Sequence, residues 1–304
     1  MNLQAMHHVT MITGDAQANV AFYADLLGLR MVKKTVNFDA PEAYHLYFAD
    51  EHGTPGSILT WFEFAGAPRG RPGAGMIHTL QLGVDGEAAL EFWKDRLDAA
   101  GYPCGEEDGV LRFADYDGLD LELHGDTHGN PPLTARHPDV PPEHAITGVQ
   151  GARAFATRPE TAREMLVYVL GFDHKREHEY VLGGDERHFH WGYDQRDERG
   201  RDGAGTVHHI AWHARDADHV PWRDRVRDAG LYVTDVIDRD YFKSIYFRTP
   251  QGILFEIATT SPGFAVDEDP AHLGEQLRLP RQHEHLRAAL EQRLTPLTNP
   301  RAQA

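Results

Sequence analysis

The chain has 304 residues, of which 41% are hydrophobic and 25% are charged, a balance typical of a globular protein of about two domains. Its single cysteine, Cys104, excludes an intrachain disulfide and a cysteine-based zinc cage, so any metal must be held by imidazole and carboxylate groups. A formal net charge of −17 argues against nucleic-acid binding. We find neither a secretory signal nor a run of about 18 apolar residues, and therefore expect a cytoplasmic protein without a membrane helix.

Four segments of the chain share one plan: a short strand, an amphipathic helix that reaches a glycine, and further strands. The units span roughly residues 4–65, 74–126, 143–195 and 205–262. We expect their helices at 19–32, 88–104, 161–175 and 220–233, with left-handed caps at Gly28, Gly101, Gly171 and Gly230. Because one such unit buries only one face of a small sheet, units must pair to close a core. The pattern predicts an α+β fold in which four βαβββ modules form paired, curved sheets around a pocket.

A proline-rich stretch separates the second unit from the third and cannot form regular structure. We therefore expect one half at residues 1–128, a linker at 129–142, a second half at 143–264 and a C-terminal tail at 265–304. In the tail, Leu286, Leu290 and Leu294 recur at a spacing typical of a short amphipathic helix. That helix would cover part of the fold or a contact in a homo-oligomer.

The register of the repeats singles out a few of the 20 histidines. Aligned first strands match His7–His8 of unit one with His208–His209 of unit four, and aligned closing strands bring forward Glu256 of unit four. The corresponding residues elsewhere are His78–Thr79, Thr147–Gly148, Glu122 and Thr60. Only units one and four therefore supply two imidazoles and a carboxylate, and we expect these two units to pair around one metal ion.

Two imidazoles and one carboxylate leave coordination positions open on the ion, which is typical of non-haem Fe(II) oxygenases, although Mn(II) suits the same ligands. A glutamate between Phe255 and Ile257 in an apolar strand would be costly to bury without such a partner. Adjacent strand residues point to opposite faces, so only one histidine of each pair can face the metal unless the strand is irregular.

The four units resemble the vicinal-oxygen-chelate superfamily, which includes glyoxalase I, extradiol dioxygenases and antibiotic-resistance proteins. Three stretches are similar to the hydroquinone ring-cleaving dioxygenases: MHHVTMITGDAQ from Met6, VKKTVNFDAPEAYHLYFADEHGTPGSILTWF from Val32, and YFKSIYFRTPQGILFEIATTSPGF from Tyr241. The resemblance implies that the second histidine of each pair ligates the metal, which makes His8, His209 and Glu256 the ligands. It also implies that Arg239 supports the site and that Tyr246 faces the substrate.

Further roles follow from position. Thr10 lies two residues after His8 on the same strand face and could touch the pocket. His208 could move a proton during ring opening, and His7 needs a separate role beside its ligand neighbour. We interpret His124, His128, His137, His188 and His190 as structural or surface residues.

We therefore expect an Fe(II)-dependent, extradiol-type dioxygenase that opens a small aromatic substrate, a hydroquinone or catechol, with O2. One alternative is a glyoxalase-type metal-dependent isomerase or lyase. In the superfamily that chemistry usually has four protein ligands, whereas Thr60 stands here at the fourth place. The other alternative is a metal-free resistance protein that sequesters an aromatic compound.

Overall fold

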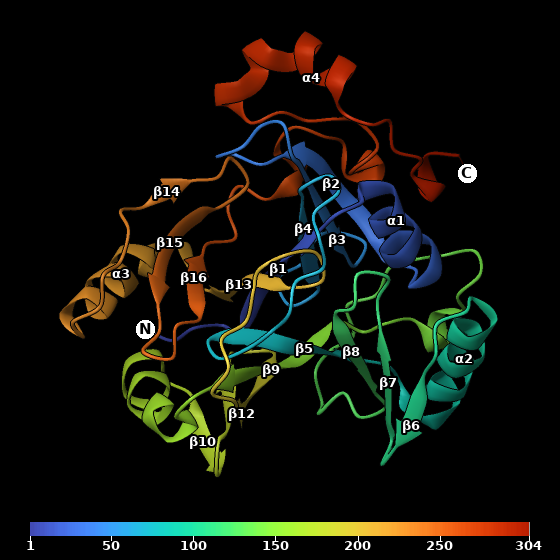
Figure 1. Ribbon diagram of the computed structural model, residues 1–304. Helices are drawn as coiled ribbons and strands as arrows, with labels where there is room; N and C mark the ends of the chain where they lie inside the picture. Colours follow the sequence, from blue (N-terminus) through green and yellow to red (C-terminus); the bar gives the residue numbers. More distant parts are fainter. Residues whose placement is uncertain (304) are drawn as a thin grey trace.

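A computed structural model describes residues 1–303, and within them the strands form two curved, eight-stranded sheets (Figure 1). The last residue of the predicted tail, 265–304, lies outside the described residues. The first sheet has the order β14-β15-β16-β13-β1-β4-β3-β2, and the second the order β10-β11-β12-β9-β5-β8-β7-β6. Unit one thus pairs with unit four, and unit two with unit three. The predicted α+β fold of four βαβββ modules is confirmed.

The first sheet contains β1 (Met6–Thr13), β2 (Arg30–Val36), β3 (Tyr44–Ala49), β4 (Ile58–Glu63), β13 (Val207–His213), β14 (Ile237–Asp238), β15 (Lys243–Arg248) and β16 (Leu254–Ala258). The second contains β5 (Met76–Gly83), β6 (Gly105–Glu107), β7 (Val110–Ala114), β8 (Asp120–His124), β9 (Val149–Ala156), β10 (Asp173–Arg176), β11 (Glu179–Gly183) and β12 (His188–Gln195). At each centre two first strands pair antiparallel: β1 with β13, and β5 with β9.

The helices are shorter than the sequence pattern suggested. They are α1 (Ala16–Val20) with a π-helical continuation over Ala21–Leu26, α2 (Gly86–Ala99), a π-helical segment over Glu164–Leu170, α3 (His219–Asp228) and, in the tail, α4 (Arg287–Arg293). The predicted ranges ran past the glycine caps into the following segments. The caps themselves are left-handed, with φ of 70°, 82°, 84° and 84° at Gly28, Gly101, Gly171 and Gly230.

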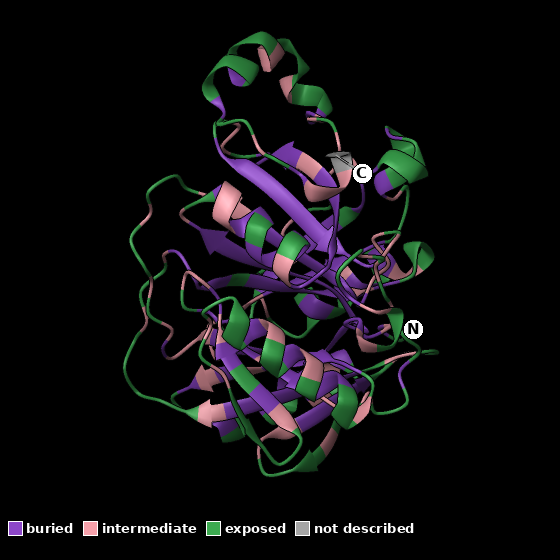
Figure 2. Ribbon diagram, turned by 90° about the vertical axis from the view of Figure 1, so that its right-hand side faces the viewer, coloured by how far each residue is buried: buried purple, intermediate pink, exposed green. Residues whose placement is uncertain are grey.

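Alternation along the central strands separates the hydrophobic core from a polar pocket. On β1, Val9 and Met11 are fully buried in the core, whereas His8 and Thr10 point to the opposite face. The sheets are mostly buried and the helices expose their outer faces (Figure 2). The two sheets also share aromatic contacts, such as Trp212 against Trp191 with ring centroids 5.8 Å apart. Trp212 lies on the strand that also carries His209, so this packing fixes the strand that holds the site.

A β-bulge recurs at the same place in all four first strands. On β1, Met6 lies opposite Trp212 and His8 opposite Ala211, so His7 is the extra residue. On β13 the extra residue is His208, and in the second sheet the bulges fall at His78 and Gln150. The match expected for unit three, Thr147–Gly148, is therefore wrong, because β9 begins only at Val149 and the register places Gln150–Gly151 there.

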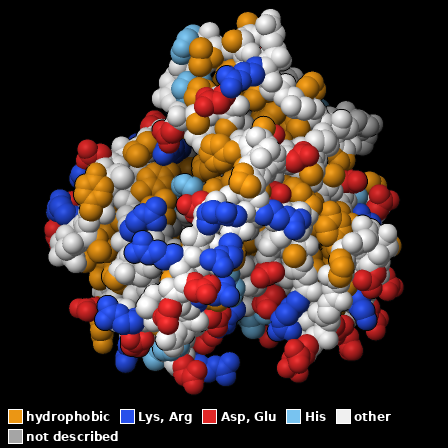
Figure 3. All heavy atoms as spheres, in the orientation of Figure 1, with side chains coloured by type: hydrophobic (Ala, Val, Ile, Leu, Met, Phe, Trp, Pro, Cys, Tyr) orange, Lys and Arg blue, Asp and Glu red, His pale blue; other side chains and the backbone are white. Residues whose placement is uncertain are grey.

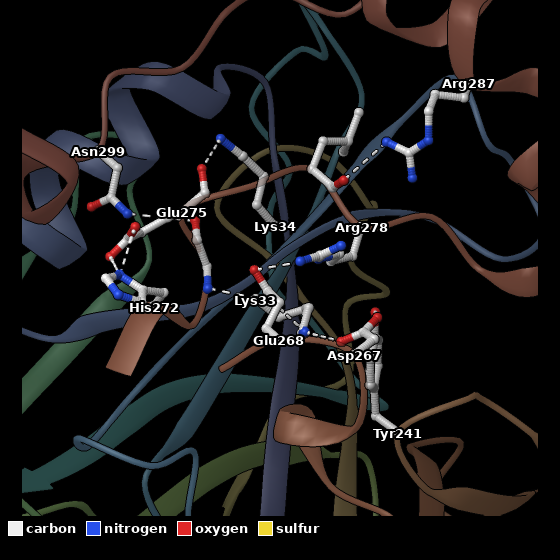
Figure 4. A network of polar contacts seen from close by, with 12 residues as sticks. Lys33, Lys34, Tyr241, Asp267, Glu268, His272, Glu275, Arg278, Arg287 and Asn299 are labelled. Carbon is white, nitrogen blue, oxygen red and sulfur yellow. Dashed lines mark hydrogen bonds and ion pairs between the residues drawn. The ribbon is translucent and has the colours of Figure 1, made fainter. Parts of the chain in front are cut away.

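The C-terminal segment runs along the edge strand β2, as the red chain at the top of Figure 1 shows. Leu277 forms a bridge with Lys34, and the Arg278 amide donates to the Lys34 carbonyl at 2.9 Å. The Lys33 ammonium is fully buried and bonds to the carboxylates of Asp267, at 2.6 Å, and Glu268 (Figure 4). In residues 1–303, no helix is long and apolar enough to cross a membrane.

Candidate metal centre and pocket

Two histidines and a glutamate from three adjacent strands converge in the first sheet. His8 comes from β1, His209 from β13 and Glu256 from β16, and one ligand atom of each lies within 4.8 Å of the other two. Glu256 Oε2 lies 3.4 Å from His8 Nε2 and 3.0 Å from His209 Nε2. All three side chains are buried. The structure thus brings together the three residues expected as ligands, from both ends of the chain.

The donor set fits a divalent cation. Burial alone would raise the pKa of Glu256, but the imidazoles of His8 and His209 hold that pKa well below its usual range, so the group is a carboxylate. Its Oε1 accepts a hydrogen bond from Ser244, whereas the buried Oε2 receives none of acceptable geometry. Burial also lowers the pKa of His209, which leaves an imidazole lone pair available. Two nitrogen donors and an unsatisfied carboxylate oxygen around one point are the ligands that Fe(II), Mn(II) or Zn(II) accept.

The two bulge histidines, His7 and His208, hold the rings of His8 and His209. His7 Nδ1 lies 2.9 Å from His8 Nδ1, and His208 Nδ1 lies 2.7 Å from His209 Nδ1. When Nε2 of a histidine binds a metal, its Nδ1 carries the ring proton. That N–H donates a hydrogen bond to a neighbouring acceptor, here Nδ1 of the bulge histidine. In a regular strand, adjacent histidines would point to opposite faces. The bulges break this alternation and let both histidines of a pair contribute to the site.

A cavity of about 500 Å³ opens beside these three residues. His8, His209, Thr10 and His208 contribute to its wall. Its aromatic lining consists of Phe38, Tyr47, Phe62, Phe64, Phe242 and Tyr246. Figure 3 shows hydrophobic side chains gathered around a hollow on this side of the molecule. The hydroxyl of Thr10 lies 2.9 Å from His209 Nε2, so Thr10 is beside a ligand atom rather than elsewhere on the strand.

Arg239 and Tyr246 form one wall of the cavity. Arg239 Nε donates to the Tyr246 hydroxyl at 3.3 Å, and its guanidinium carbon lies 5.3 Å from the centre of the Tyr246 ring. Burial raises the pKa of Tyr246, which keeps its phenol protonated. Arg239 also pairs with Asp39 at 3.3 Å, which joins unit four to unit one across the entrance.

The C-terminal tail secures the two loops at this entrance. Gln282 Nε2 donates to the Phe38 carbonyl at 2.9 Å, and His283 Nε2 lies 2.8 Å from the same oxygen. Arg281 bonds to Asp240 in the opposite loop through its amide at 2.9 Å and its Nε at 2.8 Å. The tail thus spans the entrance without lining the cavity.

Sequence reasoning missed His45 and Tyr47, which line the cavity from β3. The stretch that contains them supported the resemblance, but we assigned it no chemical role. Alternation was the available signal: Tyr47 lies opposite Thr60 on β4, as Tyr246 lies opposite Glu256 on β16. Any strand that places Thr60 at the pocket also places Tyr47 and His45 there.

The corresponding place in the second sheet is filled by side chains. Gly151 takes the position of His209, and a Cβ there would lie 2.3 Å from Gln81 Oε1. Glu122 matches Glu256 in register but bonds to His124 and Gln81, each at 2.9 Å. Among the described residues, only His8, His209 and Glu256 form a compact group of potential metal ligands.

Comparison with known proteins supports the same grouping. A sequence profile of the Glyoxalase/Bleomycin resistance protein/Dioxygenase superfamily matches residues 5–123 and 148–257. The chain is 41% identical over 302 residues to a Bacillus subtilis protein named "Putative ring-cleaving dioxygenase MhqO", covering 96% of each chain. It is 33% identical over 309 residues to the chlorohydroquinone/hydroquinone 1,2-dioxygenase of Sphingobium indicum, covering 95% of each.

Solved structures share the fold. A crystal structure titled as a putative dioxygenase from Bacillus subtilis has a TM-score of 0.90 at 39% identity and covers 98% of each chain. Glyoxalase I from Zea mays has a TM-score of 0.61 at 13% identity and covers 84% of this chain and 92% of its own, a likeness of fold alone. The matched residues, the identity across nearly the whole length and the paired βαβββ modules establish that this chain belongs to the Glyoxalase/Bleomycin resistance protein/Dioxygenase superfamily.

Proposed function

We propose that His8, His209 and Glu256 hold one Fe(II) ion and that the protein is a ring-cleaving dioxygenase of the extradiol type, which opens a small aromatic substrate with O2. The observation that carries the proposal is the opening of these three buried ligand atoms onto an aromatic-lined cavity of about 500 Å³. The names of the similar proteins, ring-cleaving dioxygenase and hydroquinone dioxygenase, support this reaction and favour a hydroquinone over a catechol.

When bound, ferrous iron supplies the redox chemistry that joins dioxygen to an electron-rich ring. The chain's own residues bind and orient that ring. Phe62 and Phe242 offer apolar surface to its faces, and Tyr246, polarised by Arg239, can donate a hydrogen bond to an ionised ring oxygen. The Arg239 cation lowers the cost of placing that negative charge in a buried cavity.

One histidine, His208, is placed to handle a proton, and Thr10 and His7 lie beside the two histidines proposed as ligands. His208 lines the cavity, and because its Nδ1 accepts from His209 Nδ1, its Nε2 carries the proton and can donate a hydrogen bond to an oxygen of the ring or of the opened product. The Thr10 hydroxyl lines the cavity 2.9 Å from His209 Nε2 and can donate a hydrogen bond to a substrate oxygen bound there. His7 keeps the His8 ring in place from behind.

Thr60 is the residue that favours a dioxygenase over a glyoxalase-type isomerase. It stands in register with Glu256, where a fourth ligand would lie, and its short side chain bonds to His45. Thr60 therefore supplies no carboxylate as a fourth ligand, and an ion held by three protein ligands would keep coordination positions for substrate and oxygen. A metal-free binding protein would have no need for an unsatisfied buried carboxylate.

The test is anaerobic loading with Fe(II), followed by oxygen-electrode assays with hydroquinones and catechols. We expect oxygen uptake with a hydroquinone, loss of uptake in Glu256→Gln, and retention in the matched control Glu122→Gln at the equivalent place of the second sheet. A parallel set loaded with Mn(II) identifies the preferred metal. Isomerisation of a hemithioacetal by the Ni(II)- or Zn(II)-loaded protein, without oxygen uptake, would replace the proposal with the isomerase.

A further inference from the structure

A second tyrosine, Tyr47, lies across the cavity from Tyr246. Its neighbour is the imidazole of His45, whereas the neighbour of Tyr246 is the guanidinium of Arg239. Tyr47 on β3 and Tyr246 on β15 lie on either side of the four strands that carry the site, and both face the same cavity. Tyr47 is opposite Thr60 in register, as Tyr246 is opposite Glu256. Two residues earlier on each strand, His45 corresponds to Ser244. The first sheet thus presents two tyrosines to a ring from opposite sides.

His45 occupies the space above Thr60 and bonds to both hydroxyls of this wall. Its Nδ1 lies 3.0 Å from the Tyr47 hydroxyl, and its Nε2 is in hydrogen-bond contact with Thr60 Oγ1. Its ring packs between Tyr47 and Phe62, with centroid distances of 4.1 and 4.4 Å. Thr60 is fully buried, whereas His45 reaches the cavity. His45 therefore fills the volume that a glutamate at position 60 would use.

The direction of these hydrogen bonds follows from the buried threonine. Within residues 1–303, Thr60 Oγ1 bonds only to His45, so the hydroxyl proton of Thr60 has no acceptor other than His45 Nε2. His45 Nδ1 then carries the ring proton, and this N–H donates a hydrogen bond to the Tyr47 oxygen. The Tyr47 proton is left free to point into the cavity. Tyr246 is in the same state, because its oxygen accepts from Arg239.

We propose that His45 positions the Tyr47 hydroxyl as the donor for a second oxygen of the aromatic substrate, opposite the oxygen held by Tyr246. This inference rests on the proposed function. The wall of Tyr246 and Arg239 is cationic and suits an ionised ring oxygen, whereas the wall of Tyr47 and His45 lacks a cation and suits a neutral hydroxyl. A ring with oxygens at opposite ends reaches both walls at once, and a ring with one oxygen reaches only one.

The experiment compares the binding of hydroquinone and of phenol under anaerobic conditions, where no ring is opened. Dissociation constants are measured by quenching of tryptophan fluorescence, for the chelator-treated protein and for the same protein loaded with Zn(II). We expect the wild type to bind hydroquinone about five- to tenfold more tightly than phenol, the size of one buried hydrogen bond. Tyr47→Phe, which removes one oxygen atom, should abolish this preference and leave phenol binding unchanged.

A second variant and a control separate positioning from folding. His45→Phe keeps a ring of similar size and should also remove the preference. The control Tyr44→Phe lies on the same strand but its hydroxyl bonds to the Thr295 carbonyl, away from the cavity, and should retain it. An unchanged preference in Tyr47→Phe, or no preference in the wild type, overturns this inference alone. Failure of the wild type to bind any phenol, with or without Zn(II), overturns the proposed function as well.

Discussion

The buried ion pair between β2 and the C-terminal segment gives a stability prediction that can be worked from the structure. Lys33 is fully buried and meets two carboxylates, Asp267 at 2.6 Å and Glu268, of which Glu268 is also buried (Figure 4). Lys33→Met leaves Glu268 with the Arg278 guanidinium, whose Nε lies 3.7 Å away, and a long bond of 3.5 Å from the Gly274 amide. Leaving a buried charge with a weaker partner costs about 3–5 kcal/mol of unfolding free energy. The melting temperature should fall by roughly 5–8 °C.

Two further variants sharpen the test. Glu268→Gln leaves Lys33 paired with Asp267 and should cost about 1–3 kcal/mol. The double variant Lys33→Met with Glu268→Leu removes both charges and should recover more than half of the loss. Lys34→Met, the neighbouring control, loses one bond to the Glu275 carbonyl at 3.0 Å and should cost about 1 kcal/mol.

The assay is urea unfolding followed by tryptophan fluorescence, with thermal unfolding by circular dichroism as a second measurement. A cost below about 1 kcal/mol for Lys33→Met would refute the reasoning, because it would mean that this pair is not desolvated. The cation–π contact of Lys33 with Tyr241, at 4.7 Å from the ring centroid, links the pair to the neighbouring pocket residue Phe242. The Michaelis constant for the ring substrate should therefore rise in Lys33→Met.

Three other outcomes follow. Arg239→Met removes the donor to Tyr246 and should lower kcat/KM on the order of tenfold, with iron content unchanged; steady-state kinetics with metal analysis check this, and full activity would contradict the role of Arg239. Burial raises the pKa of Asp115 to about 6, above its unfolded value, so the free energy of unfolding should fall as the pH rises from about 4 to 6. In Asp115→Asn the unfolding free energy, measured in urea, should change less over this pH range. Parallel curves for the wild type and the variant would exclude the effect. The double variant Gln282→Ala with His283→Ala removes both bonds to the Phe38 carbonyl and so releases the entrance loop. It should raise KM several-fold and change the melting temperature by no more than about 2 °C. Equal KM values in the wild type and the double variant would disprove this role of the tail.

Repetition made the fold, the two histidine pairs and Glu256 predictable. The bulges at His7 and His208 occur at the same place in units one and four, so they do not disturb an alignment of one unit on the other. That is why the pairs His7–His8 and His208–His209 could be chosen together with Glu256, whereas the choice of the second histidine in each pair came from the resemblance to the dioxygenases. The alignment failed for unit three, where the residues before Val149 do not belong to the strand and Gly148 has a left-handed φ of 113°.

What the sequence did not reveal depends on tertiary contacts. We assigned His45 and Tyr47 no chemical role from the sequence, and only their register against Thr60 places them in the cavity. The burial of Lys33 depends on a carboxylate 235 residues away, which no local pattern indicates. The helices ended early because a left-handed glycine stops a helix even where the apolar spacing continues into the next segment.

The central claim, a single cation held by residues from both ends of the chain, is tested most directly by anomalous diffraction at the iron edge from crystals loaded anaerobically with Fe(II). We predict one peak, at bonding distance from His8 Nε2, His209 Nε2 and Glu256 Oε2, and its loss in crystals of Glu256→Gln. A peak at the histidines of the second sheet instead, or none in crystals that bind iron in solution, would contradict the account.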